Sequence, residues 1–355
     1  MSRFFSEKYA ALTPYTPGEQ PQERQYVKLN TNESPFPPPA SVVEAAKKEA
    51  ERAHLYSDPT CKKLVDKGAE AFGVKPSQLL FTNGSDEILN FAFMAFCDQN
   101  VPAVFPDITY GFYEVFAKLN GVPYRTVALK DDFSIDPKDY YGARGTVFIA
   151  NPNAPTGLAL SKAEVEEIVK ANPDNVVVID EAYVDFGGES CVPLVQKYDN
   201  LLVTQTFSKS RSLAGARLGV GIASESLIAD FNAVKYSTNP YNVNRMTMAA
   251  GYQALVEEEY FKNNCRAICE NREYTAAALQ KMGFETLDSK TNFLFVKSNE
   301  VDGRALYEGL KARGVLVRHF NAERIKAFNR VTIGTKEQMD IFLEKTEEIL
   351  REMRK

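Results

Sequence analysis

Short apolar runs alternate with helical stretches through the middle of the chain, from about residue 79 to residue 222. The runs are rich in valine, isoleucine and leucine, and they lie at residues 79–81, 103–105, 146–149, 176–179, 201–204 and 218–222. Helical periodicity separates several of them, for example at residues 162–170. Strands that are apolar on both faces are typical of a mostly parallel sheet with helices on either side. The sequence therefore predicts an α/β fold with a large three-layer domain.

The composition and the expected elements differ between the parts of the sequence that precede and follow this region. The N-terminal residues are rich in proline and polar side chains, which predicts an extended arm because proline disrupts helices and sheet pairing. The C-terminal part combines a long helical region, short apolar runs and a final helical stretch, which predicts a smaller α+β domain. We expect an arm, a large domain and a small domain with the bounds 1–40, 41–245 and 246–355. The arm is expected to lie between the domains or against a partner subunit.

The composition excludes several classes of protein. The chain has 355 residues, of which 44% are hydrophobic and 25% charged, as is typical of a globular protein with a substantial core. A net charge of −5 gives no basic surface for nucleic acid or for an anionic membrane. No apolar run reaches the ~18 residues that span a bilayer, and the N-terminus lacks an apolar leader, so we expect a cytoplasmic protein. Five cysteines and two distant histidines predict neither a disulfide framework nor a metal site.

A lysine among hydroxyl and arginine residues follows the predicted strand at 201–204. Lys209 stands in the segment Thr206-Phe207-Ser208-Lys209, and Arg217 follows eight residues later. Cationic neighbours help to keep a lysine amine neutral, and imine formation requires the neutral amine. The hydroxyls and the arginine are groups that bind phosphate. Taken alone, a Ser-Lys pair more often marks a solvated surface lysine.

Three further segments stand where strand ends or helix starts bind ligands. Asp180 follows the run at 176–179, at the edge where α/β sheets bind ligands, although capping of the next helix is an equal alternative. The segment Asn83-Gly84-Ser85-Asp86-Glu87 predicts a helix start that attracts phosphate, or simply a capped helix. The segment Asn151-Pro152-Asn153-Ala154-Pro155-Thr156-Gly157 predicts a rigid turn that could place a polar side chain over a ring, or simply a turn.

Taken in order, these segments resemble the fold-type I aminotransferases that depend on pyridoxal 5′-phosphate (PLP). In that family a phosphate-binding helix start, an Asn-Pro turn, an acidic strand end, a Ser-Lys pair and an arginine follow one another, as they do here over nearly the whole chain. The resemblance implies that Lys209 binds PLP as a Schiff base. It also implies that Asp180 keeps the pyridine nitrogen protonated, so that the ring accepts electrons.

The arm narrows the resemblance to the histidinol-phosphate aminotransferases. Its segment Leu29-Asn30-Thr31-Asn32-Glu33-Ser34-Pro35 is similar to a signature of that family, as are the Pro-Tyr element at Tyr15 and the segment His54-Leu55-Tyr56-Ser57-Asp58-Pro59. In the family the tyrosine at the position of Tyr56 reaches the cofactor phosphate of the neighbouring subunit. The resemblance therefore implies a homodimer with shared active sites.

The resemblance also implies roles for individual side chains. Around the cofactor phosphate it implies Ser85, Asp86, Thr206, Ser208 and Arg217. At the cofactor ring it implies stacking by Tyr110 and a phenol beside the 3-oxygen from Tyr183. At the substrate it implies Tyr15, Asn32, Arg318 and Arg330, the two arginines binding its anionic end.

One position departs from the family pattern. The turn usually reads Asn-Pro-Asn-Asn-Pro-Thr-Gly, and its second central asparagine contacts the 3-oxygen of PLP, whereas this chain has Ala154 there. Either Asn153 replaces that contact, or Tyr183 makes it alone. A milder departure is Ser57, where the family has proline.

The resemblance implies the transfer of an amino group between L-histidinol phosphate and 2-oxoglutarate, a step of histidine biosynthesis. Two alternatives share the fold and most of the motifs, namely an aromatic amino acid aminotransferase and a PLP decarboxylase of the threonine-phosphate type. A third alternative is a non-catalytic ligand-binding protein, in which Lys209 would have no catalytic role. Such a protein would usually contain a DNA-binding segment, and none is evident in the sequence.

Overall fold

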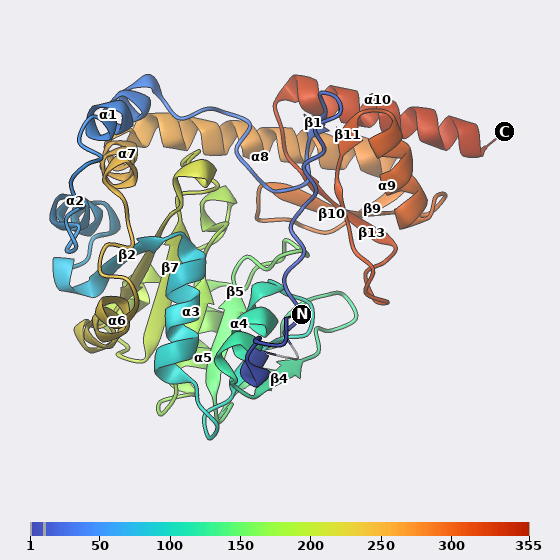
Figure 1. Cartoon of the computed structure of the whole chain (residues 1–355). Helices are drawn as coiled ribbons and strands as arrows, with labels where there is room; N and C mark the ends of the chain where they lie inside the picture. The colour runs from blue at the N-terminus through green and yellow to red at the C-terminus, as the bar shows by residue number, and fades with distance from the viewer. Residues whose placement is uncertain (1, 10–11, 355) are drawn as a thin grey trace.

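A seven-stranded sheet forms the centre of the large domain in the computed structural model, which describes residues 2–9 and 12–354 (Figure 1). Its strands are β2 (Leu79–Asn83), β3 (Ala103–Pro106), β4 (Tyr124–Val127), β5 (Thr146–Ala150), β6 (Val177–Asp180), β7 (Leu201–Thr206) and β8 (Leu218–Ala223). Their order is β2-β8-β7-β6-β5-β3-β4. Strand β8 is antiparallel to both its neighbours, and the other pairs are parallel. The predicted α/β fold with a mostly parallel sheet is confirmed.

Helices cover both faces of this sheet because successive residues of a strand point to opposite sides. In β6, Val177 and Ile179 join the core beneath α2 (Lys62–Phe72), α5 (Lys162–Lys170) and α7 (Arg245–Val256). The side chain between them, Val178, joins the core beneath α3 (Ser85–Phe96), α4 (Phe112–Asn120) and α6 (Glu225–Thr238). The three layers therefore follow directly from the continuous apolar runs of the strands.

A four-stranded antiparallel sheet forms the small domain. Its strands are β9 (Phe284–Thr286), β10 (Phe293–Ser298), β12 (Arg318–His319) and β13 (Phe328–Thr332), in the order β12-β13-β10-β9. Its core includes residues of α8 (Glu258–Lys281), α9 (Gly303–Ala312) and α10 (Lys336–Met353). Helix α7 packs instead against α1 (Ala40–Ala50) and α2. We therefore infer that the domains divide at Glu257, between α7 and α8, rather than at residue 245.

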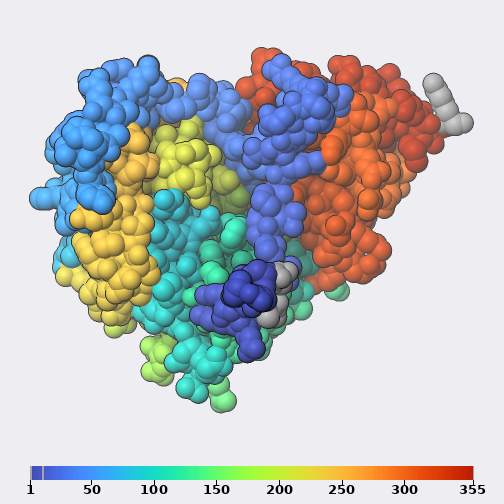
Figure 2. Space-filling view, in the orientation of Figure 1, coloured from blue at the N-terminus to red at the C-terminus, as the bar shows by residue number. Residues whose placement is uncertain are grey.

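The N-terminal arm crosses from one domain to the other. Strand β1 (Val27–Lys28) pairs in parallel with β11 (Val315–Leu316), and Leu29 is buried in the core of the small domain. The preceding residues run back to the large domain, where the ring of Tyr15 packs on Phe112 with centroids 4.4 Å apart. Figure 2 shows this path, with the blue arm passing from the orange small domain onto the cyan and green large domain.

Among the residues that the structure describes, no helix combines the length and the apolar character needed to cross a membrane.

The contact between β8 and the start of α3 yields a stability prediction. A Cβ at Gly219 would lie 2.3 Å from the backbone nitrogen of Ser85 and 2.4 Å from the carbonyl carbon of Gly84, so an alanine there must displace backbone. We expect Gly219→Ala to lower the free energy of unfolding by about 1–3 kcal/mol, the usual penalty for overpacking. Urea unfolding without added ligand measures this. Gly215→Ala is the matched control, because a Cβ there meets nothing within 4 Å. Equal stability of the two variants would contradict the prediction.

Candidate active site

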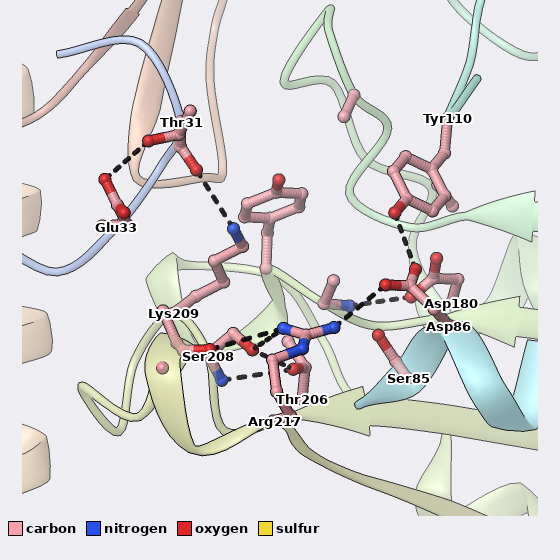
Figure 3. A pocket seen from close by; sticks show the side chains of 16 residues that line it. Thr31, Glu33, Ser85, Asp86, Tyr110, Asp180, Thr206, Ser208, Lys209 and Arg217 are labelled. Carbon is pink, nitrogen blue, oxygen red and sulfur yellow. Dashed lines mark hydrogen bonds and ion pairs between the residues drawn. The ribbon is translucent and has the colours of Figure 1, made fainter. Parts of the chain in front are cut away.

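A cavity of about 330 Å³ opens at the carboxyl ends of β6 and β7, beside the N-terminus of α3 (Figure 3). Nine of the predicted site residues line it, namely Ser85, Asp86, Tyr110, Asp180, Tyr183, Thr206, Ser208, Lys209 and Arg217. Two residues of the arm, Thr31 and Glu33, also line it, although the sequence motif around them gave no role to either. The parts of the sequence that carry the predicted chemistry therefore meet at one place.

Lys209 extends into this cavity from the loop after β7. Its amine donates a hydrogen bond to the backbone oxygen of Thr31 at 3.2 Å. Removal of the amine from water and, less strongly, the positive charge of Arg330 together lower the pKa of Lys209 to about 8, against the opposing effect of Glu33. Within the described part of the chain, no carboxylate lies within ion-pair distance of this amine. A substantial neutral fraction near neutral pH suits a nucleophilic amine.

Asp180 ends β6 and lies at the wall of the same cavity. Its carboxylate accepts hydrogen bonds from the Tyr113 hydroxyl at 3.1 Å and from the backbone nitrogen of Ala182 at 3.3 Å. Burial raises the pKa of Asp180 to about 7, because desolvation disfavours the charged form. No cation among residues 2–9 and 12–354 pairs with it, so this buried carboxylate fits a ligand that carries a positively charged N–H group.

The other end of the cavity fits an anion. Arg217 pairs with Asp86 at 3.1 Å, and its second nitrogen lies 3.5 Å from the hydroxyl of Ser208. The first turn of α3 presents backbone N–H groups here, and such helix starts bind phosphate. Gly84 is required at this point, because its φ is +75° and a Cβ would lie 2.6 Å from the guanidinium of Arg217. Thr206 completes the group through its 3.0 Å hydrogen bond to Ser208.

The structure gives Asn32 a different place from the one expected. Its side chain does not line the cavity; its amide donates to the hydroxyl of Tyr183 at 2.9 Å, and its oxygen accepts from Thr332 at 2.9 Å. The expected direct contact between Asn32 and a substrate has no support in this geometry. Asn32 instead orients Tyr183. Because the Tyr183 hydroxyl accepts this hydrogen bond, its own proton remains available for donation.

The side chain of Asn153 is engaged within the turn, so the structure offers no support for its expected contact with a cofactor. The amide nitrogen of Asn153 donates to the backbone oxygen of Ile108 at 3.0 Å and to Thr156 at 3.1 Å, and its oxygen accepts from Thr109 at 2.8 Å. These bonds fix the side chain inside the turn, and the methyl group of Ala154 faces the cavity instead. Of the two alternatives that the sequence left open, the geometry favours Tyr183 acting alone.

Arg330 lies close to the site without lining the cavity. One of its terminal nitrogens donates to the backbone oxygen of Asn30 at 3.1 Å, and its guanidinium lies over the rings of Phe293 and Phe320, at 5.3 Å and 5.9 Å from their centroids. Its Nε is buried and has no hydrogen-bond partner in the described structure. A buried donor without a partner is costly, which fits a bound anion at this position.

Three predicted residues lie away from the cavity. Tyr56 is 81% exposed, and its ring stacks on Tyr241 with centroids 4.6 Å apart. Tyr15 packs against α4, as described above. Arg318 donates to the backbone oxygens of Thr16 and Pro17 in the arm, at 3.2 Å and 3.3 Å. Tyr56 therefore does not reach the cavity of its own chain.

The cavity as a whole fits PLP. Arg217, Ser208 and the start of α3 suit its phosphate, and the buried carboxylate of Asp180 suits its protonated ring nitrogen. Tyr110 forms one wall beside this carboxylate, and its hydroxyl donates to Asp86 at 2.7 Å.

Comparisons with known proteins agree with this geometry. The family described as aminotransferase class I and II matches residues 24–345. The histidinol-phosphate aminotransferase of Brachyspira hyodysenteriae is 47% identical over 353 residues, which cover 99% of this chain and 100% of that protein. The histidinol-phosphate aminotransferase of Clostridium beijerinckii is 44% identical over 351 residues, which cover 99% of this chain and 98% of that protein.

A solved structure shows the same fold. The crystal structure of histidinol-phosphate aminotransferase from Sinorhizobium meliloti in complex with pyridoxal-5′-phosphate superposes with a TM-score of 0.90 and covers 99% of each chain. Its sequence is 24% identical to this one, so the likeness concerns the fold.

The raised pKa of Asp180 yields a prediction on stability. The folded protein binds this proton more tightly than the unfolded chain, whose carboxyl has its ordinary pKa of 3.8, so stability falls as the pH rises from about 4 to about 7. Asp180→Asn removes this dependence. The free energy of unfolding of the variant, relative to that of the wild type, should therefore increase by up to about 4 kcal/mol over that range.

Urea unfolding without added ligand at pH 4.5, 6 and 8 tests this expectation. The difference between the variant and the wild type should grow with pH. Asp131→Asn, which changes a carboxylate at an exposed position, is the control. Parallel curves for Asp180→Asn and the wild type would refute the assignment of a buried, destabilised carboxylate.

Proposed function

This chain belongs to the family of class I and II aminotransferases, and from that membership we propose that it transfers an amino group between L-histidinol phosphate and 2-oxoglutarate with PLP as cofactor. The observation that carries the proposal is the lysine of lowered pKa, Lys209, which faces the same cavity as an unpaired buried carboxylate, Asp180. Relatives that are 44–47% identical over nearly the full chain bear the name of this activity.

PLP, when bound, supplies a protonated ring that accepts the electron pair released at the substrate Cα. Asp180 would keep the proton on the ring nitrogen, because its buried carboxylate forms no ion pair with a cation of the described residues. The amine of Lys209 would act as the general base that takes the proton from the substrate Cα. The pKa of about 8 keeps part of that amine neutral at physiological pH.

The remaining polar groups of the cavity would bind and orient the cofactor. Arg217, Ser208 and Thr206 would bind the cofactor phosphate with the amides of the first turn of α3. The hydroxyl of Tyr183 accepts a hydrogen bond from Asn32, and it can donate its own proton into the cavity.

Arg330 and Arg318 are proposed to bind the anionic end of the substrate. The protein is net acidic, so a phosphorylated substrate requires a local cationic group, and the planar guanidinium suits phosphate oxygens. Arg330 has a buried Nε without a partner. Within the described residues, the hydrogen bonds of Arg318 go to carbonyl oxygens of the arm, which an anion would outcompete.

The substrate test compares donors in the first half-reaction. We expect conversion of L-histidinol phosphate to exceed that of L-histidinol and phenylalanine, with no release of carbon dioxide from threonine phosphate. Arg330→Ala and Arg318→Ala should each lower kcat/KM for the phosphorylated donor about tenfold more than for L-histidinol, the size of one lost hydrogen bond to a charged group.

Stopped-flow absorbance of the cofactor measures each half-reaction separately. Arg351→Ala is a control, because that exposed arginine pairs with Glu347 on α10, away from the cavity. If both donors lose the same factor in the Arg330 and Arg318 variants, the arginines do not recognise phosphate. Faster turnover of phenylalanine by the wild type would favour an aromatic aminotransferase.

A homodimer with shared active sites is the second part of the proposal. Tyr56 is exposed on the face formed by α1, α2 and α7, and its backbone oxygen accepts a hydrogen bond from Arg245 at 3.0 Å. Lys235, which is buried, donates to the backbone oxygen of Pro59 in the same loop. An exposed tyrosine on a loop fixed in this way can reach a cavity across a twofold axis.

Mixing of two inactive variants tests this arrangement. Lys209→Ala and Tyr56→Ala should each be inactive or severely impaired as pure dimers. After subunit exchange, each mixed dimer has one intact site of two, so about a quarter of the wild-type activity should return. Exchange is verified by a mass tag on one variant. Absence of recovery in verified mixed dimers would place Tyr56 outside the partner's site.

A further inference from the structure

Tyr113 forms a hydrogen bond to the catalytic carboxylate from behind the cavity wall. It lies in the first turn of α4, and no part of its side chain is exposed to solvent. Its hydroxyl donates to Oδ2 of Asp180 at 3.1 Å, although Tyr113 does not line the cavity itself. The sequence motifs gave it no role, because it lies outside the segments that carry the resemblance.

Packing leaves this hydroxyl little freedom. The ring of Tyr113 lies against Phe105 and Phe148 with centroids 5.8 Å away, and it meets Tyr110 edge-on at 5.7 Å. Burial, together with the negative charge of Asp180, raises the pKa of Tyr113 well above its ordinary value, so the hydroxyl remains a donor at every physiological pH. Its donation to the carboxylate is therefore a permanent feature of the site.

The surroundings of Asp180 otherwise disfavour its charge. Desolvation is the largest effect and raises its pKa, and the carboxylate of Asp86 on α3 acts in the same direction. Three groups oppose them. The hydroxyl of Tyr113 opposes them most strongly, and the backbone N–H of Ala182 and the charge of Lys209 contribute less. Tyr113 is thus the strongest of these three groups in stabilising the ionised carboxylate.

We propose that Tyr113 is a positioning residue, whose hydroxyl fixes the carboxylate of Asp180 and stabilises its charge, so that Asp180 accepts a hydrogen bond from the ring nitrogen of the cofactor without taking its proton. A carboxylate that already accepts a hydrogen bond is a weaker base. Without the Tyr113 hydroxyl, Asp180 would compete more strongly for the proton. The inference rests on the proposed use of PLP, and it concerns the location of one proton between Asp180 and the ring nitrogen.

The experiment compares two buried tyrosines. Tyr113→Phe removes only the oxygen and keeps the ring contacts, so the fold is expected to survive. Tyr140→Phe is the matched control, because Tyr140 is 1% exposed and its hydroxyl has no hydrogen-bond partner in the described structure. The apoenzymes are titrated by equilibrium dialysis with PLP and with its 1-deaza analogue, in which a C–H group replaces the ring nitrogen. Unfolding curves of all three proteins verify that they are folded.

Tyr113→Phe should bind PLP about tenfold more weakly than the wild type, the size expected for one hydrogen bond to a charged group. It should bind the deaza analogue at least as tightly as the wild type, because that ligand offers no N–H to Asp180. Tyr140→Phe should match the wild type with both ligands.

Two results would overturn the inference: unchanged binding of PLP by Tyr113→Phe, or an equal loss for PLP and the deaza analogue, which would mean that Tyr113 only packs the wall. Failure of the wild type itself to bind PLP would instead refute the proposed function, so the two failures are distinguishable.

Discussion

The site depends on the removal from water of two ionisable side chains, Asp180 and Lys209, which face one cavity without forming an ion pair. Burial brings both pKa values toward neutrality, to about 7 for the carboxyl and about 8 for the amine. The sheet makes this possible, because the ends of β6 and β7 lie side by side with helices over both faces. Such perturbed groups are typical of functional sites, and they lower the stability of the fold without ligand.

The second constraint is that three separate parts of the chain complete the site. The backbone oxygen of Thr31 in the arm accepts a hydrogen bond from Lys209, and the next residue, Asn32, bonds to Tyr183. Asn32 is in turn fixed by Thr332 of the small domain. A change in the position of the small domain would therefore reach Tyr183 through the arm. This linkage explains why the arm lies between the domains instead of extending into solvent.

Much of this architecture could be predicted from the sequence. The remaining features could not, for physical reasons. The continuous apolar runs predicted six strands, whereas the edge strand β4 was missed because only Val127 of its residues is buried. The residues of the Ser-Lys segment and the acidic strand end were predicted to meet, and they do. The places of Asn32 and Asn153 were not predictable, because side-chain hydrogen bonds to distant segments determine them. No sequence pattern distinguished Tyr113, since a buried tyrosine in a helix is typical of a hydrophobic core.

The attachment of PLP to Lys209 is the central claim, and chemical trapping tests it most directly. The purified protein is incubated with PLP, reduced with borohydride and digested, and the peptides are identified by mass spectrometry. The account predicts one pyridoxyl group per chain, located on Lys209, and none after the same treatment of Lys209→Ala. A pyridoxyl group on a different lysine, or equal labelling of the Lys209→Ala variant, would contradict it.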